Sequence, residues 1–385
     1  MTKEVPERAG VVVIGGGVIG LSAAYHLASR GVRDVVLLDQ DDFGSGSTSK
    51  AAGGVRAQFS DEVNILLAKR SLEVFERFGE LFDQPIDLHT VGYLFLLDDD
   101  GDVDDFERAV ALQNSLGVPT RMIDPAEAQR LSPLISTDGL LAASWHPGDG
   151  HCAPEAVVQG YARAARRAGA TLVSGCAVTG AEVEDGRIRA VLTEGGRIET
   201  EQVVCAAGAW SGQVAGWFGV DLPVEPLRRQ IVCTGPVPGR VPPTPFTIDF
   251  SSSFYFHDEG PGLLVGMSDR DETPGFKLGR DDAWLGGLAA AIERRAPALA
   301  DIEIRSGWAG LYEMTPDHNG LIGVAADVPG FTYATGFSGH GFLMGPSVGE
   351  VVAALVCGEA PVVDVSPLDV ARFARGEVTP EKHIV

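Results

Sequence analysis

Cysteine is scarce in this chain, which has five in 385 residues. They stand far apart, at positions 152, 176, 205, 233 and 357, with no Cys-x-x-Cys pair and no cysteine–histidine cluster. This spacing argues against a disulfide framework and against a structural zinc site. We therefore expect no metal centre, and a reducing, cytoplasmic location.

Positively charged residues are also few: the chain has 30 Lys and Arg but 53 Asp and Glu, which gives a net charge of −23. Such a surface repels phosphate backbones and anionic lipid headgroups, which argues against nucleic-acid and membrane-surface partners. The hydrophobic share of 45% and the charged share of 22% are ordinary for a folded protein. The length predicts two or three domains.

Long apolar runs are absent except for one, residues 10–29, which carries no formal charge. Its length would suffice to span a bilayer, but it contains five glycines and His26. We interpret it instead as a buried strand over 11–14 followed by a helix over 18–30. No membrane span is expected.

The rest of the chain alternates between helix and strand patterns. A second buried strand at 35–39 completes a βαβ unit, and residues 223–245 form a proline-rich stretch that predicts an irregular crossing between domains. Further helices are predicted at 64–78, 104–116, from Pro154, 282–295 and 345–357, and single strands at 93–97, 171–173, 202–206, 321–324 and 331–335. Residues 178–183, 187–192 and 197–200 predict a small antiparallel meander, and 246–268 predicts strands of an open sheet.

These patterns predict a mixed fold of α/β and α+β type. Segments typical of a doubly wound sheet occur near both ends of the chain and in its middle, so the nucleotide-binding domain is expected to be discontinuous. We assign 1–85, 148–222 and 307–385 to that domain. An antiparallel-sheet substrate domain, 86–147 and 223–306, is expected as a double insertion.

The sharpest motif is Gly15-Gly16-Gly17-Val18-Ile19-Gly20, a GxGxxG that directly follows a strand and opens a helix. Gly15 suits the tight turn, Gly17 lets the backbone approach a pyrophosphate, and the helix N-terminus attracts phosphate charge. Asp39 stands nineteen residues after Gly20, where an acid can bind a ribose. The motif predicts dinucleotide binding but does not separate NAD from FAD.

Residues 44–54, GSGSTSKAAGG, follow the second strand and are rich in glycine and hydroxyl side chains. Composition alone leaves two interpretations open, a flexible solvent loop or a backbone path along a second stretch of an extended cofactor.

Four blocks together resemble the D-amino-acid oxidase superfamily of FAD enzymes. They are the N-terminal unit with GSGSTSKAAGGVRAQF, VVCAAGAWS at 203–211, WAGLYEMTPDHNGLIG at 308–323 and ATGFSGHGFLMGPSVGE at 334–350. The likeness is strongest to the branch of sarcosine oxidases, dimethylglycine dehydrogenases and L-proline dehydrogenase β-subunits. The resemblance implies a FAD-binding Rossmann-like domain of glutathione-reductase type, and it specifies cofactor and fold better than substrate.

Pro346 and Ser347 mark a helix start in the sequence, and a helix N-terminus there would stabilise negative charge on reduced flavin, although an ordinary capped helix after a glycine-rich turn is the alternative. The resemblance itself implies a set of cofactor contacts. The implied FAD-binding residues are Gly15, Gly17, Val18, Ile19, Gly20, Asp39, Gln40, Ser47, Thr48, Gly53, Gly54, Val178, Ala207, Gly208, Trp210, Gly339, His340, Gly341, Phe342 and Leu343.

Catalytic candidates are fewer. The resemblance places His340 and Arg56 beside the flavin, although a structural histidine and a surface ion pair are the plainer alternatives. Tyr255 and His257 are expected on the substrate sheet, where they would cap the polar end of a substrate or simply occupy an exposed strand face.

The chain departs from the sarcosine oxidases at several positions. Gly310 replaces the cysteine that binds flavin covalently, which implies non-covalent FAD. Phe59 and Leu343 replace the basic partners of the substrate carboxylate, and Leu264 or a neighbour replaces the oxygen-activating lysine, with Lys277 out of register. Arg56, Arg228 and Arg229 remain as candidate carboxylate partners.

The leading hypothesis is a FAD-dependent oxidoreductase of secondary amines or amino acids. A neutral amine would transfer hydride to the flavin, the resulting imine would hydrolyse, and oxygen or another acceptor would take the electrons. An alternative is a flavin-binding subunit or assembly factor that needs partner chains, so oligomers and partner subunits stay open. A NAD-dependent reductase is the third, weakened by the presence of a single fingerprint.

Overall fold

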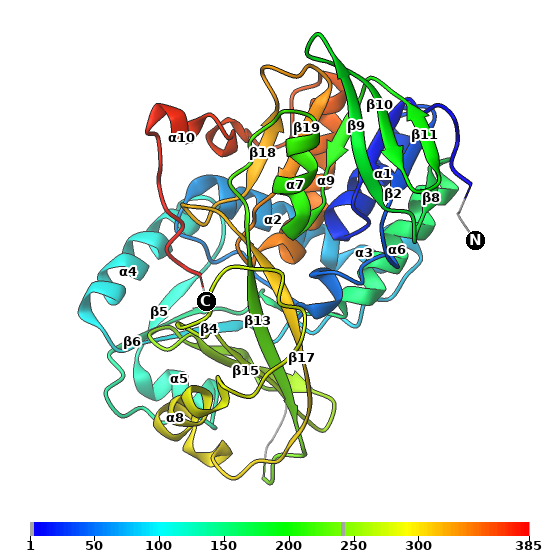
Figure 1. Ribbon diagram of the computed structural model, residues 1–385. Helices are drawn as coiled ribbons and strands as arrows, with labels where there is room; N and C mark the ends of the chain where they lie inside the picture. The colour runs from blue at the N-terminus through cyan, green and yellow to red at the C-terminus, as the bar shows by residue number, and fades with distance from the viewer. Residues whose placement is uncertain (1–3, 240–242, 385) are drawn as a thin grey trace.

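The computed structural model describes residues 4–239 and 243–384 (Figure 1). One of its layers is a six-stranded sheet in the order β18-β19-β12-β1-β2-β8, parallel except for the β18–β19 pair. Its strands are β1 (Val11–Ile14), β2 (Val35–Leu38), β8 (Thr171–Val173), β12 (Val203–Cys205), β18 (Leu321–Val324) and β19 (Phe331–Thr335). This order brings the N-terminal, middle and C-terminal segments of the chain into one sheet.

Both faces of the parallel sheet are covered, which explains its continuous apolar strands. One face packs against helices α1 (Val18–Ser29), α2 (Glu62–Glu76), α3 (Phe78–Phe82), α6 (Pro154–Arg167) and α9 (Gly341–Cys357). The other face packs against α7 (Ser211–Trp217) and the antiparallel sheet of β9 (Val178–Glu184), β10 (Arg187–Thr193) and β11 (Gly196–Glu199).

Helices α1 and α9 cross closely beneath the sheet because glycines line their contact. A Cβ atom on Gly345 would lie 2.6 Å from Cγ2 of Val18, and one on Gly349 would lie 2.1 Å from Oγ of Ser22. The N-terminal ends of both helices therefore approach the same region of the molecule, where the cavity described below opens.

The second layer is an eight-stranded sheet in the order β17-β13-β16-β15-β14-β4-β6-β5, antiparallel except for the β14–β4 pair. Its strands are β4 (Tyr93–Leu97), β5 (Arg121–Ile123), β6 (Ala142–His146), β13 (Glu225–Thr234), β14 (Phe246–Asp249), β15 (Phe254–Glu259), β16 (Gly262–Met267) and β17 (Ile304–Met314). Helices α4 (Asp100–Ser115), α5 (Pro125–Leu131) and α8 (Leu285–Arg295) lie in the same segments of the chain as these strands. Strands β3 (Gly54–Val55) and β7 (Gly150–His151) form a separate two-stranded sheet.

The proline-rich segment is more regular than predicted, because residues 225–234 form β13. This strand pairs with β17 from Glu225–Met314 to Thr234–Ile304, and the two strands run together from one lobe into the other (Figure 1). Pro226 is tolerated because β16 pairs only from Gln230 onward, so no neighbouring strand needs an amide proton from Pro226, whose carbonyl accepts from Gly275 N at 2.7 Å.

Helix α9 begins at Gly341, four residues before the predicted start, and Pro346 lies inside it. Pro346 lacks an amide proton for the intrahelical bond, but it does not mark the beginning of the helix. Helices α2 and α4 also begin earlier than predicted, since Asp61 and Asp99 cap them by accepting from Asn64 N (2.9 Å) and Gly101 N (2.8 Å).

The predicted fold class is confirmed: a parallel, doubly covered sheet combined with a larger, mainly antiparallel one. The domain limits themselves stay a prediction. Within the described residues, no helix combines the length and apolarity needed to cross a bilayer. All five cysteines are free thiols, and the cytoplasmic location stays a prediction.

Candidate active site

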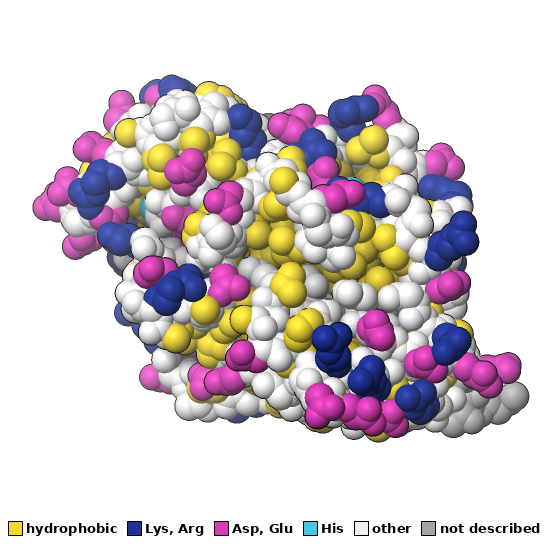
Figure 2. Space-filling view, turned by 90° about the horizontal axis from the view of Figure 1, so that it is seen from above, with side chains coloured by type: hydrophobic (Ala, Val, Ile, Leu, Met, Phe, Trp, Pro, Cys, Tyr) yellow, Lys and Arg dark blue, Asp and Glu magenta, His cyan; other side chains and the backbone are white. Residues whose placement is uncertain are grey.

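A cavity of about 650 Å³ lies between the two sheets, within the size range of small-molecule and cofactor sites. Figure 2 shows apolar side chains gathered in a hollow of the surface, with charged side chains mostly around the edge of that face. Of the residues predicted from sequence, the cavity is lined by Gly15, Gly17, Val18, Ile19, Asp39, Gln40, Ser47, Thr48, Gly53, Gly54, Arg56, Val178, Ala207, Gly208, Trp210, Tyr255, Gly339, His340, Gly341, Phe342 and Leu343.

One end of the cavity is a cradle of backbone at the start of α1. Gly15 has φ +108°, and a Cβ there would lie 2.2 Å from the carbonyl oxygen of Ala206, so only glycine fits. The first turn of α1 has no acidic residue, and its N-cap, Gly17, offers no side-chain cap. The positive end of the helix dipole therefore faces the cavity.

Asp39 follows β2 at the same end of the cavity. Its carboxylate accepts from the amide of Gly16 (2.6 Å) and from that of Asp41 (2.8 Å), which fixes its orientation. Burial raises the pKa of Asp39. The oxygen atoms keep lone pairs for a further donor, as the recognition of a ribose hydroxyl requires.

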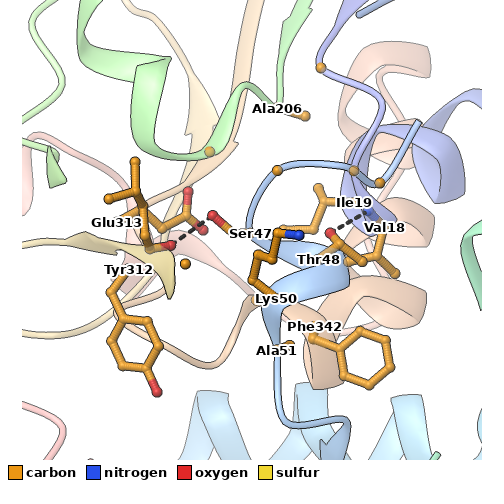
Figure 3. Close-up of a pocket in the computed structure, with 18 of the residues that line it drawn as sticks. Val18, Ile19, Ser47, Thr48, Lys50, Ala51, Ala206, Tyr312, Glu313 and Phe342 are labelled. Atoms are coloured by element: carbon orange, nitrogen blue, oxygen red, sulfur yellow. Dashed lines mark hydrogen bonds between the residues drawn. The ribbon is translucent and has the colours of Figure 1, made fainter. Parts of the chain in front are cut away.

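The serine- and glycine-rich loop crosses the middle of the cavity as the 3-10 helix η1 (Thr48–Lys50), between α1 and the end of β17 (Figure 3). Thr48 Oγ1 accepts from Val18 N at 3.2 Å, and Ser47 Oγ donates to the carbonyl of Leu311 at 2.7 Å. The loop is thus an ordered wall of the cavity and not a flexible solvent segment.

The other end of the cavity meets the N-terminus of α9. His340 is the N-cap residue, and the first turn again contains no acidic residue. Glu313 lies nearby, buried without a cationic partner among the described residues. It accepts from Thr335 Oγ1 (2.9 Å) and Phe337 N (3.3 Å), and burial raises its pKa.

Three tyrosines of the eight-stranded sheet, Tyr93, Tyr255 and Tyr312, face the cavity beyond this point. Tyr93 and Tyr312 lie against Gly54 and Gly339 respectively, because a Cβ on either glycine would overlap the neighbouring ring. Burial raises the pKa of all three phenols, which keeps them protonated and able to donate. With Ile231, Phe246 and Ile248 they form a chamber that is apolar with a few phenolic hydroxyls.

Two arginines in the cavity wall have no carboxylate within ion-pair distance among the described residues. Arg229 lies 5.2 Å from the Tyr312 ring centre, and its buried Nε has no hydrogen-bond partner. Arg56 is 3% exposed and donates to the carbonyls of Gln58 and His383. Arg228, in contrast, forms ion pairs with Glu272 and Asp281.

His340 is held neutral beside Arg56. Its Nε2 lies 3.4 Å from Nη2 of Arg56, and its ring packs edge-on against Phe59. Burial, and next the Arg56 cation, lower the pKa of His340 to about 3. At neutral pH the ring is therefore available as an acceptor for the guanidinium and not as a general acid.

This neutral histidine predicts a pH dependence of stability. Between its unfolded pKa of 6.5 and about 3, His340 binds a proton in the unfolded chain but not in the folded one. The free energy of unfolding should therefore fall on acidification, by about 1.4 kcal/mol per pH unit from this residue alone. Urea unfolding from pH 6.5 to 4.5 should give a shallower slope for His340→Asn; an unchanged slope would contradict the assignment.

Two predicted site residues do not line the cavity. His257 is buried behind the wall, where its ring nitrogens lie 2.9 Å from the carbonyl of Ala52 and 2.8 Å from that of Asp258. It holds the backbone of the serine- and glycine-rich loop at Ala52. Tyr255 and His257 share one face of β15, where both rings stack on Phe246, but only Tyr255 lines the cavity. Gly20 packs under the turn, where a Cβ would lie 1.9 Å from the carbonyl oxygen of Gly15.

The positions that depart from the sarcosine oxidase pattern also have structural roles. Phe59 packs beneath Arg56, 4.1 Å from its guanidinium carbon, and Leu264 is buried in the sheet. Gly310 leaves room for Lys50, since a Cβ there would lie 2.6 Å from Cβ of Lys50. Lys277 pairs with Glu272 outside the cavity lining.

Sequence reasoning missed several cavity residues. Tyr312 and Glu313 lie inside a block that was recognised, but only their neighbours were assigned roles. Tyr93 and Phe246 lie on strands whose apolar pattern predicts burial and gives no sign of a chamber. Lys50 lies inside the recognised glycine-rich loop and also lines the cavity.

The comparisons with known proteins agree with this geometry. A family model described as FAD dependent oxidoreductase matches residues 10–355. The chain belongs to this family. Its cofactor is FAD, and the resemblance inferred from the four sequence blocks is confirmed.

Individual relatives extend this assignment. This FAD-dependent oxidoreductase is 31% identical to the mitochondrial sarcosine dehydrogenase of Mus musculus over 97% of its length, but spans 42% of that protein. It is 32% identical to FAD-dependent oxidoreductase domain-containing protein 1 of Bos taurus, covering 99% of the chain and 88% of the relative. The chain thus spans about two fifths of the sarcosine dehydrogenases that it matches.

Solved structures give the same result for the fold. L-proline dehydrogenase from P. horikoshii superposes with a TM-score of 0.91 at 36% identity, covering 97% of this chain and all of that one. Glycine oxidase from Geobacillus kaustophilus gives a TM-score of 0.84 at 27% identity, and the match covers 95% of this chain and 99% of that one.

The residues present fit FAD on structural grounds. The cradle at Gly15 and Gly17 would hold the pyrophosphate, Asp39 the adenosine ribose, and the α9 N-terminus the far end of the cofactor. The two helix N-termini, neither with an acidic residue in its first turn, are positive groups of the kind that an anionic, two-ended cofactor requires.

Proposed function

We propose that this flavoenzyme oxidises the C–N bond of a secondary amine or amino acid that carries a carboxylate. The observation that carries the proposal is the chamber next to the flavin end of the cavity. Its wall combines apolar side chains with three protonated tyrosines and an arginine whose buried Nε is unpaired. The relatives named for sarcosine, dimethylglycine, proline and glycine support this class of substrate.

Arg229 is the group we assign to the substrate carboxylate. A planar guanidinium can bind a carboxylate through two parallel hydrogen bonds, which fixes orientation as well as position. Its neighbour Tyr312, whose ring centre lies 5.2 Å from the guanidinium carbon, would supply a phenolic donor in the same chamber. The carboxylate would thereby hold the amine end of the substrate toward α9 and the flavin.

The apolar side chains of the chamber act on the protonation state of the substrate. Ile231, Phe246 and Ile248 offer no counter-ion to an ammonium, so desolvation favours the neutral amine. When bound, FAD would supply the electron sink for a hydride, which carries both electrons, from the carbon next to nitrogen. The chain's own contribution is orientation and the exclusion of water, and hydrolysis of the imine follows.

A substrate panel tests the proposal. Under anaerobic conditions, N-methyl amino acids, proline and primary amino acids are mixed with the purified protein in a stopped-flow instrument. We expect at least one of them to remove the visible absorbance of oxidised flavin within a single turnover. If every compound leaves the spectrum unchanged while dithionite reduces the flavin, the amine assignment is wrong. Subsequent mixing with oxygen or an artificial dye shows which acceptor is used.

FAD is proposed to be bound without a covalent link. Gly310 has no nucleophile, and the cavity's single cysteine among the described residues, Cys176, lies beside Asp39 at the adenine end. Precipitating the protein with acid should release all of the yellow colour into the supernatant as intact FAD. Colour that stays with the pellet after unfolding would show a covalent bond.

A further inference from the structure

Residues 379–384 pass between the two lobes and reach the cavity wall from a distant part of the sequence. We call this segment the strap; in Figure 1 it is the red chain that descends from α10 (Arg372–Arg375) toward the space between the lobes. It forms no helix or strand. Its position therefore depends on the side chains that hold it.

Glu381 is the main anchor of the strap. Its carboxylate, 1% exposed, accepts from the amide of Ser60 at 3.1 Å through both oxygens and from the amide of His383 at 2.8 Å. Asn319 Nδ2 donates to the carbonyl of Thr379 at 2.7 Å. The Ser60 bonds tie the strap to the chain between Arg56 and α2, and the Asn319 bond ties it to the segment between β17 and β18.

His383 is the second anchor. Its ring stacks on Phe106 with centroids 3.7 Å apart and an interplanar angle of 12°. Both ring nitrogens are buried without a partner, so the ring contributes packing and not hydrogen bonds. The stack directs the carbonyl oxygen of His383 toward Arg56.

Arg56 is the residue that the strap reaches. Its Nη2 donates to the carbonyl of His383 at 2.6 Å, and the guanidinium also contacts the Gln58 carbonyl, His340 and the rings of Phe59 and Phe95. A guanidinium buried without a carboxylate partner is oriented by such fixed dipoles. The strap therefore supplies one of the two carbonyls that hold this cation in the cavity wall.

We propose that the strap is a positioning element of the active site, which sets the reduction potential of the flavin by holding Arg56 in place. A fixed cation in the wall beside the α9 N-terminus stabilises the reduced, anionic cofactor more than the oxidised one. Withdrawing the His383 carbonyl lets Arg56 move and admits water, and both changes weaken that stabilisation. The inference rests on the cofactor and is independent of the substrate.

Four variants test the proposal through the midpoint potential, measured by equilibration with a reference dye and without any amine. Arg56→Met removes the cation, and Glu381→Ala and His383→Ala each release one anchor. We expect each to lower the equilibrium constant for flavin reduction about tenfold, or about 30 mV for a two-electron couple. Lys382→Ala is the control, because its exposed side chain pairs with Asp105 outside the cavity lining, and it should leave the potential unchanged.

A double variant shows whether the strap acts through Arg56. In the Arg56→Met background, Glu381→Ala should cause no further shift, since the residue that it positions is gone. An equal shift in both backgrounds, or unchanged potentials in both anchor variants, would overturn the proposal. A failure of the amine panel would leave these potentials measurable, so the two tests are independent.

Discussion

Replacing Arg229 with methionine is expected to lower kcat/KM for a carboxylate-bearing amine at least about 30-fold, equivalent to about 2 kcal/mol. Methionine keeps much of the apolar stem but cannot donate to a carboxylate. Because Arg229 has no ion-pair partner among the described residues, its loss leaves no protein carboxylate unpaired. The effect should therefore appear in catalysis, while flavin content and thermal stability stay near those of the wild type.

The neighbouring arginine provides the control for this prediction. Arg228 is adjacent on β13 but binds Glu272 and Asp281, so Arg228→Met should change kcat/KM by less than about threefold. Amines without a carboxylate should react equally with wild type and Arg229→Met. An equal loss for both kinds of substrate would show that Arg229 supports the fold and does not bind the carboxylate.

Replacing Gly15 with alanine is expected to yield a colourless protein. The new Cβ would lie 2.2 Å from the Ala206 carbonyl oxygen, at a backbone φ of +108° that alanine rarely adopts. The turn between β1 and α1 must then shift, and the phosphate cradle with it. Absorbance of the purified variant, before and after incubation with excess FAD, measures the loss.

A second glycine separates this local effect from general destabilisation. Gly286 lies in α8, and a Cβ there would meet no atom within 4 Å. Gly286→Ala should retain its full complement of FAD and gain slightly in stability, since alanine favours the helix. If Gly15→Ala also retained FAD, the cradle would not be the pyrophosphate site.

The cofactor half of the site could be predicted from sequence because its signals are local. Gly15 to Gly20 lie next to their strand and helix, and Asp39 directly follows the next strand, so a short window contains most of the cradle. Ala206, against which Gly15 packs, lies outside that window. The sequence places the start of the last long helix at 345, because Pro346 has the pattern of a first-turn proline. The helix α9 in fact begins at Gly341, since the adjoining glycines allow an earlier start.

The substrate half could not be predicted in the same way. Tyr93, Tyr255 and Tyr312 come from three strands far apart in sequence, and only sheet order β17-β13-β16-β15-β14-β4 brings them together. The contact between Arg56 and His383 joins residues 327 positions apart, and it uses a backbone carbonyl that no side-chain pattern reveals. Long-range pairing, and not composition, creates this part of the site.

The most direct test of the account compares the rates of anaerobic flavin reduction by a reactive substrate and by its analogue with deuterium on the carbon next to nitrogen. If the chamber holds that C–H bond against the flavin, the deuterated compound should reduce the flavin measurably more slowly. Identical rates at saturating substrate, or no reduction by either compound, would contradict the assignment of C–N bond oxidation to this cavity.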